Sequence, residues 1–209
     1  MSSFDMANAV EARGLDALMP FLQHVSFNGQ FTLTHKGALA PMLQTCIGDF
    51  LLNYGDKSTV YGVELKVEQE NKHDNLFLET WSNRNFSPRR VGWMMSNEAD
   101  FLWYYFLKQD NLLIFNFRKI WEWAHIKPSK IVPPGVGRMY DFSEKAQSKY
   151  EQRNLTAGRC VPIETLASEV GFVLYEPRRN GLRGRSRINS ATDWRSATLE
   201  PAATSRYGG

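Results

Sequence analysis

Three charged residues, Asp49, Glu64 and Lys66, lie in two neighbouring segments of otherwise apolar or alternating sequence. Residues 46–54 and 60–67 are expected to form strands, because they are rich in β-branched, aromatic and other apolar residues and flank a polar turn. If the turn centres near residues 56 and 57, paired residues have numbers that sum to about 113, which places Asp49 opposite Glu64. Lys66 then projects from the same face as Glu64, two residues further along the strand.

Two carboxylates that face each other across a hairpin, with Cβ atoms about 5 Å apart, repel and destabilise the sheet. A divalent ion between them removes the conflict, and Mg²⁺ binds to one or two carboxylates together with waters and phosphate oxygens. We therefore expect Asp49, Glu64 and the backbone carbonyl of Leu65 to bind Mg²⁺ or Mn²⁺. Lys66 is expected to orient or deprotonate an attacking water, or to stabilise charge that builds on a phosphate.

A glutamate and a lysine two residues apart are also common on ordinary strands, where they form a weak ion pair on a solvated face. Asp49 argues against that interpretation here. An aspartate between Ile47 and the apolar residues 50–52 is not typical of a surface strand.

The elements that must position these residues follow from the apolar pattern on either side of the hairpin. A helix is expected over residues 4–23 and a short strand over 31–34. A third strand over 76–81 follows the hairpin closely, so three successive strands are expected to form an antiparallel meander.

A helix is expected over residues 99–107, because Ser96 or Asn97 can cap it and Glu98 and Asp100 suit its positive N-terminal end. The remaining expected elements are a strand over 112–117, short helices over 118–125 and 165–170, and a last strand over 172–175. Together they predict an α/β or α+β core in which helices flank a central mixed sheet.

Three regions are expected along the chain. Residues 1–126 form the core, and residues 127–176 form an extension that packs on it. The extension begins with a long surface excursion over 127–160, which is rich in proline, glycine and polar residues. Residues 177–209 are expected to be a flexible basic tail, because glycine, serine, arginine and alanine dominate them.

The charged residues and the order of elements resemble the PD-(D/E)XK nuclease superfamily. Gly48-Asp49 matches the acidic residue on the second core strand, and Glu64-Leu65-Lys66 matches the (D/E)-x-K motif on the third. The resemblance covers residues 5–125 and implies a restriction-endonuclease-like core of a helix, a three-stranded meander, a helix and a further strand. The stretch from Val63 through Trp81 to Gly92-Trp93 and Ala99-Asp100 is also similar to uncharacterised bacteriophage and prophage proteins with this core.

The sequence departs from the superfamily pattern at one position and leaves the auxiliary residues open. Gly48, rather than proline, precedes Asp49. Members often carry a glutamate on the first core helix that assists a second metal, and Glu11 is the candidate. Glu79 on the next strand is the other candidate for an auxiliary catalytic carboxylate, although an exposed strand carboxylate is an equally good interpretation.

Charge is distributed unevenly along the chain. The formal net charge is +3, and residues 177–209 contain seven arginines against Asp193 and Glu200, which leaves −2 for the first 176 residues. A basic tail on a mildly acidic body suits a protein that holds an acidic centre against a polyanion. The residues expected to contact nucleic acid are Arg84, Arg89 and Arg90 in a polar loop and Arg178 and Arg179 in the tail; solubility alone is the competing explanation.

Other catalytic classes lack support in the sequence. Cys46 and Cys160 belong to no metal-binding motif, the four histidines have no ligand spacing, and there is no phosphate-binding glycine loop. Two cysteines suit a reducing compartment, and we see neither a signal peptide nor a membrane-length apolar segment. A cytoplasmic location is expected, in the host cytoplasm if the protein is phage-encoded, with no membrane partner.

These observations predict a Mg²⁺-dependent deoxyribonuclease that hydrolyses phosphodiester bonds. The alternative is a catalytically inactive, nuclease-like phage protein that acts as a virion component or binds and inhibits a host defence protein. Residues 99–107 and 127–160 would then supply the interface with a phage or host protein. Cleavage of RNA rather than DNA uses the same chemistry, and a homodimer is compatible with the sequence.

Overall fold

The computed structural model describes residues 3–34, 40–54, 59–84, 90–124, 138–148, 155–175 and 177. The helices are α1 (Ser3–Val25), α2 (Ala40–Ile47), α3 (Trp93–Ser96), α4 (Phe117–Ala124) and α5 (Ile163–Glu169), with a 3₁₀ turn, η1, at Arg138–Asp141. The strands are β1 (Ser26–Leu33), β2 (Phe50–Tyr54), β3 (Val60–Glu68), β4 (Asn75–Asn83), β5 (Arg90–Val91), β6 (Phe101–Phe106), β7 (Asn111–Asn116), β8 (Glu144–Ser148), β9 (Leu155–Pro162) and β10 (Val173–Tyr175). Of the helices described, none is long and apolar enough to cross a membrane.

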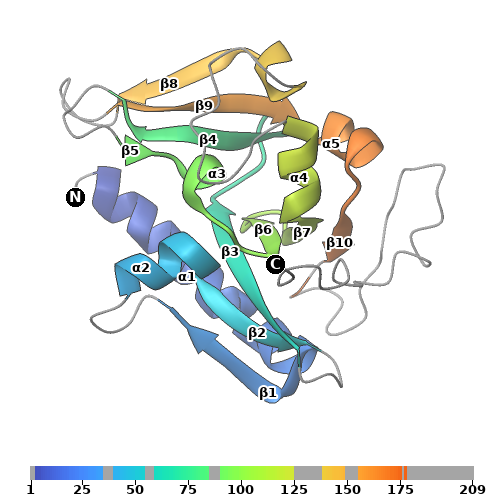
Figure 1. The fold of residues 1–209 in the computed structure, drawn as a ribbon. Coiled ribbons are helices and arrows are strands. Elements are labelled where there is room, and N and C mark those ends of the chain that lie inside the picture. The colour runs from blue at the N-terminus through green and yellow to red at the C-terminus, as the bar shows by residue number, and fades with distance from the viewer. Residues whose placement is uncertain are drawn as a thin grey trace, which may run out of the picture.

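The strands form two sheets (Figure 1). One has six strands in the order β1-β2-β3-β6-β7-β10, and the other has four in the order β5-β4-β9-β8. The first sheet is mixed, because β6 runs parallel to β3 while its other neighbouring strands pair antiparallel. The expected α/β class, with a central mixed sheet flanked by helices, is confirmed.

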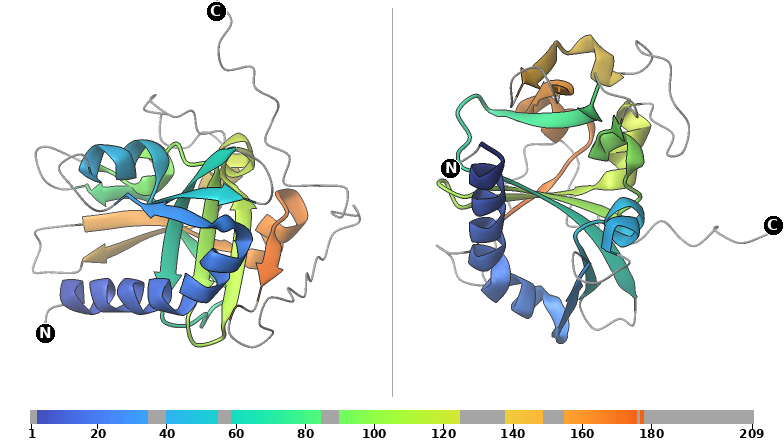
Figure 2. Two further views of the ribbon diagram at one scale, coloured as in Figure 1. Left: turned by 90° about the horizontal axis from the view of Figure 1, so that it is seen from below. Right: turned by 90° about the vertical axis from the view of Figure 1, so that its left-hand side faces the viewer.

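The six-stranded sheet separates two apolar cores. Helix α1 lies across one face (Figure 2), where Leu18, Phe21 and Leu22 pack against Val63 and Trp103. The opposite face packs against the second sheet and α4, through residues that include Leu76 and Leu78 of β4 and Ile120 of α4. The molecule is therefore layered, with the central strand β3 enclosed from both sides.

Residues 101–106 form the buried strand β6 and not the expected helix over 99–107. All six of these residues are buried. Alternate side chains reach opposite cores: Trp103 packs on the α1 side, and Tyr104 packs on the side of the second sheet. A strand buried on both faces is apolar throughout, so it shows no period of two, and a short run of this kind cannot be distinguished from a helix by periodicity.

The polar residues expected to cap that helix instead connect β6 to β3. The Asp100 side chain accepts a hydrogen bond from the Gly62 amide at 2.9 Å, and the Asp100 amide donates to the Gly62 carbonyl at 2.8 Å. Asp100 therefore helps to align the start of the parallel pair. The only helix described between β3 and β6 is the short helix α3, which ends before Asp100.

The strand expected over residues 46–54 begins later than predicted. Residues 40–47 form α2, so Cys46 lies in a helix, and β2 begins at Phe50. The predicted register is nevertheless confirmed, because Phe50 pairs with Val63 and Leu52 with Tyr61, and each pair of numbers sums to 113. Asp49 lies one residue before the strand.

The strand expected over residues 76–81 is present as β4, but it does not belong to the predicted meander. The antiparallel meander consists of β1, β2 and β3, whereas β4 pairs with β5 and β9 in the second sheet. The prediction failed because a short connection makes strand pairing probable without requiring it.

The surface excursion expected over residues 127–160 is wrong for its last part. Strand β9 pairs along β4 from Asn75 to Trp81, and Ala157 and Val161 are buried. The expected strand at 112–117, helices at 118–125 and 165–170 and last strand at 172–175 correspond to β7, α4, α5 and β10. The tail 178–209 lies outside the described residues, as do residues 125–137.

Candidate active site

The turn before β2 places Asp49 beside the middle of β3. Gly48 has a φ of +99°, and a Cβ there would lie 2.4 Å from the Val63 carbonyl oxygen, so this turn requires glycine. The Asp49 amide donates to the Val63 carbonyl at 2.7 Å. The Leu65 amide donates to Asp49 Oδ2, also at 2.7 Å. The carboxylate of Asp49 is thereby attached to the residue between Glu64 and Lys66.

Glu64 and Lys66 project from the same face of β3, as their spacing predicts, and their charged groups form an ion pair. Glu64 is only 4% exposed, whereas 29% of the Lys66 side chain is exposed. A buried ion pair at a strand centre is costly unless further hydrogen bonds complete it. Asn97 provides such a hydrogen bond to Glu64, and Trp93 of α3 contacts the ammonium group of Lys66.

Asn97, directly after α3, completes the surroundings of Glu64. Its side-chain amide donates to Glu64 Oε2 and to the Gln44 carbonyl, the latter at 3.2 Å. Trp93, the first residue of α3, lies against Lys66, whose Nζ is 5.4 Å from the centre of the indole ring. Sequence reasoning assigned no site role to Asn97, which it treated only as a helix cap, because the contact depends on how α3 packs against β3.

The electrostatics of the pair follow from its burial and its neighbours. The pKa of Glu64 is raised to about 7: burial is the largest cause, Lys66 opposes the shift, and the negative charges of Asp49 and Glu11 add to it. Burial alone would lower the pKa of Lys66, but the carboxylates of Glu64, Asp49 and Glu11 outweigh it, so that pKa is raised. Lys66 is therefore a firmly protonated cation among three carboxyl groups.

Helix α1 brings Glu11 toward this cluster. A Cβ at Gly14 would lie 2.4 Å from Val67 Cγ1, so glycine lets α1 approach β3 closely one turn from Glu11. Glu11 and Asp49 both line a groove of about 510 Å³ whose floor includes Leu15, Leu33, Phe50 and Leu65. Asp49 thus faces the groove beside α1, and its charge and that of Glu11 act on both Glu64 and Lys66.

Glu79, the other auxiliary candidate, is not brought to the cluster. It lies on β4 in the second sheet, where its carboxylate accepts a hydrogen bond from the Ser82 hydroxyl. Glu79 was expected near Lys66 only if β4 paired beside β3 in the meander. Because β4 belongs to the second sheet, the alternation of side chains does not place Glu79 beside Lys66. Of the two candidates, Glu11 is the one whose charge acts on Glu64 and Lys66.

The oxygen atoms of Asp49, Glu64 and the Leu65 carbonyl are donors that suit a hard divalent cation. Within the described part of the chain, no three or more His, Cys, Asp or Glu side chains are arranged to hold a metal ion. A site here would use Asp49 and Glu64 with a main-chain carbonyl and waters, which is the ligand set that Mg²⁺ prefers. The N–H and C=O of one strand residue point to the same side, and the Leu65 N–H points to Asp49, so the Leu65 carbonyl faces Asp49 as well.

The predicted nucleic-acid contacts are only partly described. Arg84 is exposed, and one nitrogen of its guanidinium forms an ion pair with Glu144 of β8. Arg90 is exposed on β5, two residues before Gly92 and α3. Arg89, Arg178 and Arg179 lie outside the described residues.

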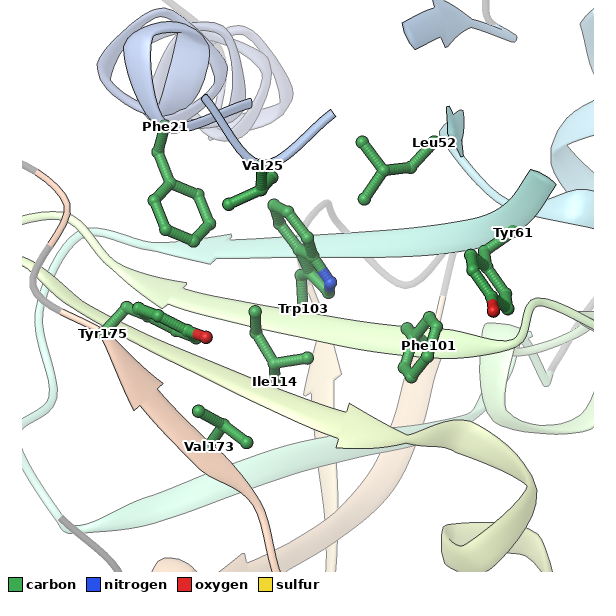
Figure 3. A pocket seen from close by; sticks show the side chains of 9 residues that line it. All are labelled: Phe21, Val25, Leu52, Tyr61, Phe101, Trp103, Ile114, Val173 and Tyr175. Atoms are coloured by element: carbon green, nitrogen blue, oxygen red, sulfur yellow. The ribbon is translucent and has the colours of Figure 1, made fainter. Parts of the chain in front are cut away.

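A second cavity lies near the C-terminal end of α1 (Figure 3). Phe21, Leu52, Trp103 and Ile114 are among the apolar side chains that line it, and its volume is only about 20 Å³. That volume has room for about one water molecule. The cavity is a packing defect of the α1 core and is too small for a nucleotide.

Comparison of the chain with family models, curated proteins and solved structures gives no match.

Proposed function

We propose that this protein is a metal-dependent nuclease of the PD-(D/E)XK type that hydrolyses phosphodiester bonds in DNA. The observation that carries the proposal is the attachment of Asp49 to the Leu65 amide, between the paired side chains of Glu64 and Lys66. It gathers two carboxylates and an ammonium group beside β3, at the point where β2 begins. A structural ion pair on β3 would need neither Asp49 nor the strained turn at Gly48.

The topology around the cluster supports the same proposal. Helix α1, the antiparallel strands β1 to β3, and β6 parallel to β3 correspond to the order expected of a restriction-endonuclease-like core. The connection from β3 to β6 differs from that expectation, because it contains β4, β5 and the short helix α3 in place of a long helix. This insertion supplies Trp93 and Asn97 to the cluster.

The residues divide the chemistry among them. Asp49, Glu64 and the Leu65 carbonyl would hold Mg²⁺, which when bound supplies Lewis-acid activation of water and of the phosphate. Lys66 remains protonated, so it acts as a hydrogen-bond donor that orients the water and stabilises negative charge on the phosphate, and not as a general base. Glu11 would assist from the side of the groove.

DNA binding is supported by an exposed arginine near α3 and by the basic composition of the tail. Arg90 is exposed close to α3, and the tail carries a net charge of +5 through its seven arginines. Such contacts hold the phosphate backbone without selecting a sequence. Parallel assays on duplex DNA, single-stranded DNA and RNA would determine the substrate class.

The central test replaces the site residues by isosteric neutral ones. Asp49→Asn and Lys66→Met are expected to lower Mg²⁺-dependent DNA cleavage at least about 100-fold, because each removes a charge used in the transition state. The matched controls are Glu122→Gln and Lys119→Met on the exposed side of α4, which should cleave like the parent. Circular dichroism would establish that all four variants fold. If Asp49→Asn and Lys66→Met cleave as fast as the controls, the proposal is wrong.

The competing proposal is a nuclease-like protein that only binds a phage or host protein. Its supporting observation is that Lys66 and Asn97 already occupy both oxygens of Glu64. It would be favoured if the protein neither binds Mn²⁺ nor cleaves nucleic acid but forms a stable complex with a protein partner. Calorimetry with Mn²⁺ separates the two proposals before any substrate is known.

A further inference from the structure

Helix α3 is held firmly between the second sheet and β3. The Gly92 amide donates to the Thr80 carbonyl of β4 at 2.7 Å, and the Met95 and Ser96 amides donate back to the Gly92 carbonyl. A Cβ on Gly92 would lie 2.4 Å from the Glu79 carbonyl oxygen, so the close approach requires glycine. The position of α3 is therefore set by β4.

The spacing of Trp93 and Asn97 matches that of Lys66 and Glu64. Four residues of helix rise about 6 Å, and two residues of strand span about 6.6 Å. The Asn97 amide donates to the Trp93 carbonyl at 3.1 Å, which closes the single turn between them. One turn of helix thus spans the two charged residues on β3, with Trp93 on Lys66 and Asn97 on Glu64.

Asn97 has only one orientation that satisfies its surroundings. It is 3% exposed, its Nδ2 donates to Glu64 and to the Gln44 carbonyl, and its Oδ1 accepts from the Ala99 amide at 2.8 Å. The reversed amide would place Oδ1 against a carboxylate and a carbonyl, which are both acceptors. Asn97 therefore holds Glu64 Oε2 in place and leaves the rest of the carboxylate to Lys66 and a cation.

Trp93 restricts the ammonium group of Lys66 in a comparable way. The ring face attracts the cation at 5.4 Å, and the carboxylates of Glu64, Asp49 and Glu11 compete for it. Trp93 is itself held by Phe117 of α4, at a ring-centre distance of 5.9 Å. Without the ring, only the ion pair with Glu64 would oppose a turn of the ammonium group toward Asp49 and Glu11.

We propose that Trp93 and Asn97 are positioning residues that hold Lys66 and Glu64 in the arrangement used for catalysis, an inference that rests on the proposed nuclease function. They are called the positioning pair below. Neither residue touches the reacting atoms; each acts through its partner on β3. The segment between β3 and β6 therefore supplies the two residues that hold Lys66 and Glu64 in place.

The first experiment observes Lys66 directly. In protein labelled with ¹⁵N-lysine, the signal of the Lys66 ammonium group is identified by its absence in Lys66→Met. Its protons lie over the indole ring, so Trp93→Leu is expected to move the signal downfield, while Trp93→Phe retains a ring and most of the shift. Ser96→Ala on the same turn removes a hydroxyl that donates to Gly92 and is the matched control. An unchanged signal in Trp93→Leu overturns the role of Trp93.

The second experiment measures Mn²⁺ binding and cleavage in Asn97→Leu, which keeps the volume of the side chain but loses its hydrogen bonds. The affinity for Mn²⁺ and kcat are expected to fall about 10- to 100-fold, with KM for DNA nearly unchanged, because the residue orients a ligand and does not bind substrate. Equal affinity and kcat in a folded Asn97→Leu protein overturn the role of Asn97. If Asn97→Leu does not fold, the Mn²⁺ affinity and kcat of Trp93→Leu and Trp93→Phe are measured in its place. Equal affinity and kcat in both variants and the parent would overturn the proposal.

The two proposals fail differently. If the parent protein neither binds Mn²⁺ nor cleaves DNA, the nuclease function is wrong, yet the Lys66 signal still tests the contact of Trp93 with Lys66. If the parent cleaves DNA and both sets of variants match the Ser96→Ala control, the nuclease function stands and the positioning pair is wrong.

Discussion

Glu64 carries an unusual combination of burial, a lysine partner and a second carboxylate. Its pKa of about 7 in the folded protein lies above the ordinary value of 4.5. Between these two values the folded protein retains a proton that the unfolded chain has lost. The contribution of Glu64 to stability is therefore fully present below pH 4.5 and is lost as the pH rises through 7.

This shift predicts a pH-dependent free energy of unfolding. From pH 4.5 to pH 7.5 the parent should lose on the order of 3 kcal/mol through Glu64, and Glu64→Gln should lack this loss because its side chain does not titrate. Urea unfolding of both proteins at several pH values measures the difference. Glu68, whose pKa burial also raises, is present in both proteins and cancels. Parallel pH profiles for the two proteins would contradict the prediction.

Binding of Mg²⁺ should oppose the loss of stability that Glu64 causes as the pH rises. A cation competes with the proton for Glu64, so Mg²⁺ is expected to raise the melting temperature at pH 8 more than at pH 5.5. Asp49→Asn should abolish the effect at both pH values, because it removes the second carboxylate. Thermal melts with and without Mg²⁺ test this. An equal Mg²⁺ effect at both pH values would show that the ion binds elsewhere.

At the scale of elements, the turn before β2 determines where Asp49 lies. Gly48 combines a φ of +99° with a neighbouring carbonyl only 2.4 Å from the position of a Cβ. Gly171 has a similar φ of +81° but has nothing within 4 Å. The two glycines therefore differ mainly in steric contact.

Gly48→Ala is expected to lower the free energy of unfolding by at least about 3 kcal/mol, since backbone strain and a steric clash add together. Gly171→Ala should cost only about 1 kcal/mol, from strain alone. Urea denaturation of both variants measures the two costs. Equal costs would mean that the close approach of Gly48 to Val63 is absent in solution.

At the scale of the whole molecule, the core predicted over residues 1–126 does not contain all of its own strand partners. Strand β9 pairs with β4 along its length, and β10 pairs with β7. Leu76 and Leu78 of β4 are fully buried in the core that β9 helps to close. The extension over 138–175 is thus part of both sheets.

A chain that ends at residue 124 should therefore lack a cooperative thermal transition, because β4 loses its partner and the second core is exposed. A chain that ends at residue 177 keeps every described element and is the matched control, which should melt cooperatively. Circular dichroism during heating distinguishes the two. A cooperative transition in the shorter chain, near the temperature of the control, would mean that residues 1–124 fold alone.

The sequence by itself determined the hairpin and the residues that it carries. Its turn residues and period-two pattern specify the register that pairs Phe50 with Val63, and this register depends only on contacts between neighbouring segments. Asp49, Glu64 and Lys66 could be singled out because an aspartate in an apolar run is unusual. The strand β7 and the helix α4 were also predictable from local pattern.

The tertiary structure alone decided which distant segments meet. Residues 101–106 became a strand because both faces of β6 are covered, by α1 on one side and by the second sheet on the other. Strand β4 left the meander because β9, about 80 residues further on, supplied its partner. The choice of Glu11 over Glu79, and the contacts of Trp93 and Asn97 with Lys66 and Glu64, follow from those non-local pairings, which local periodicity cannot encode.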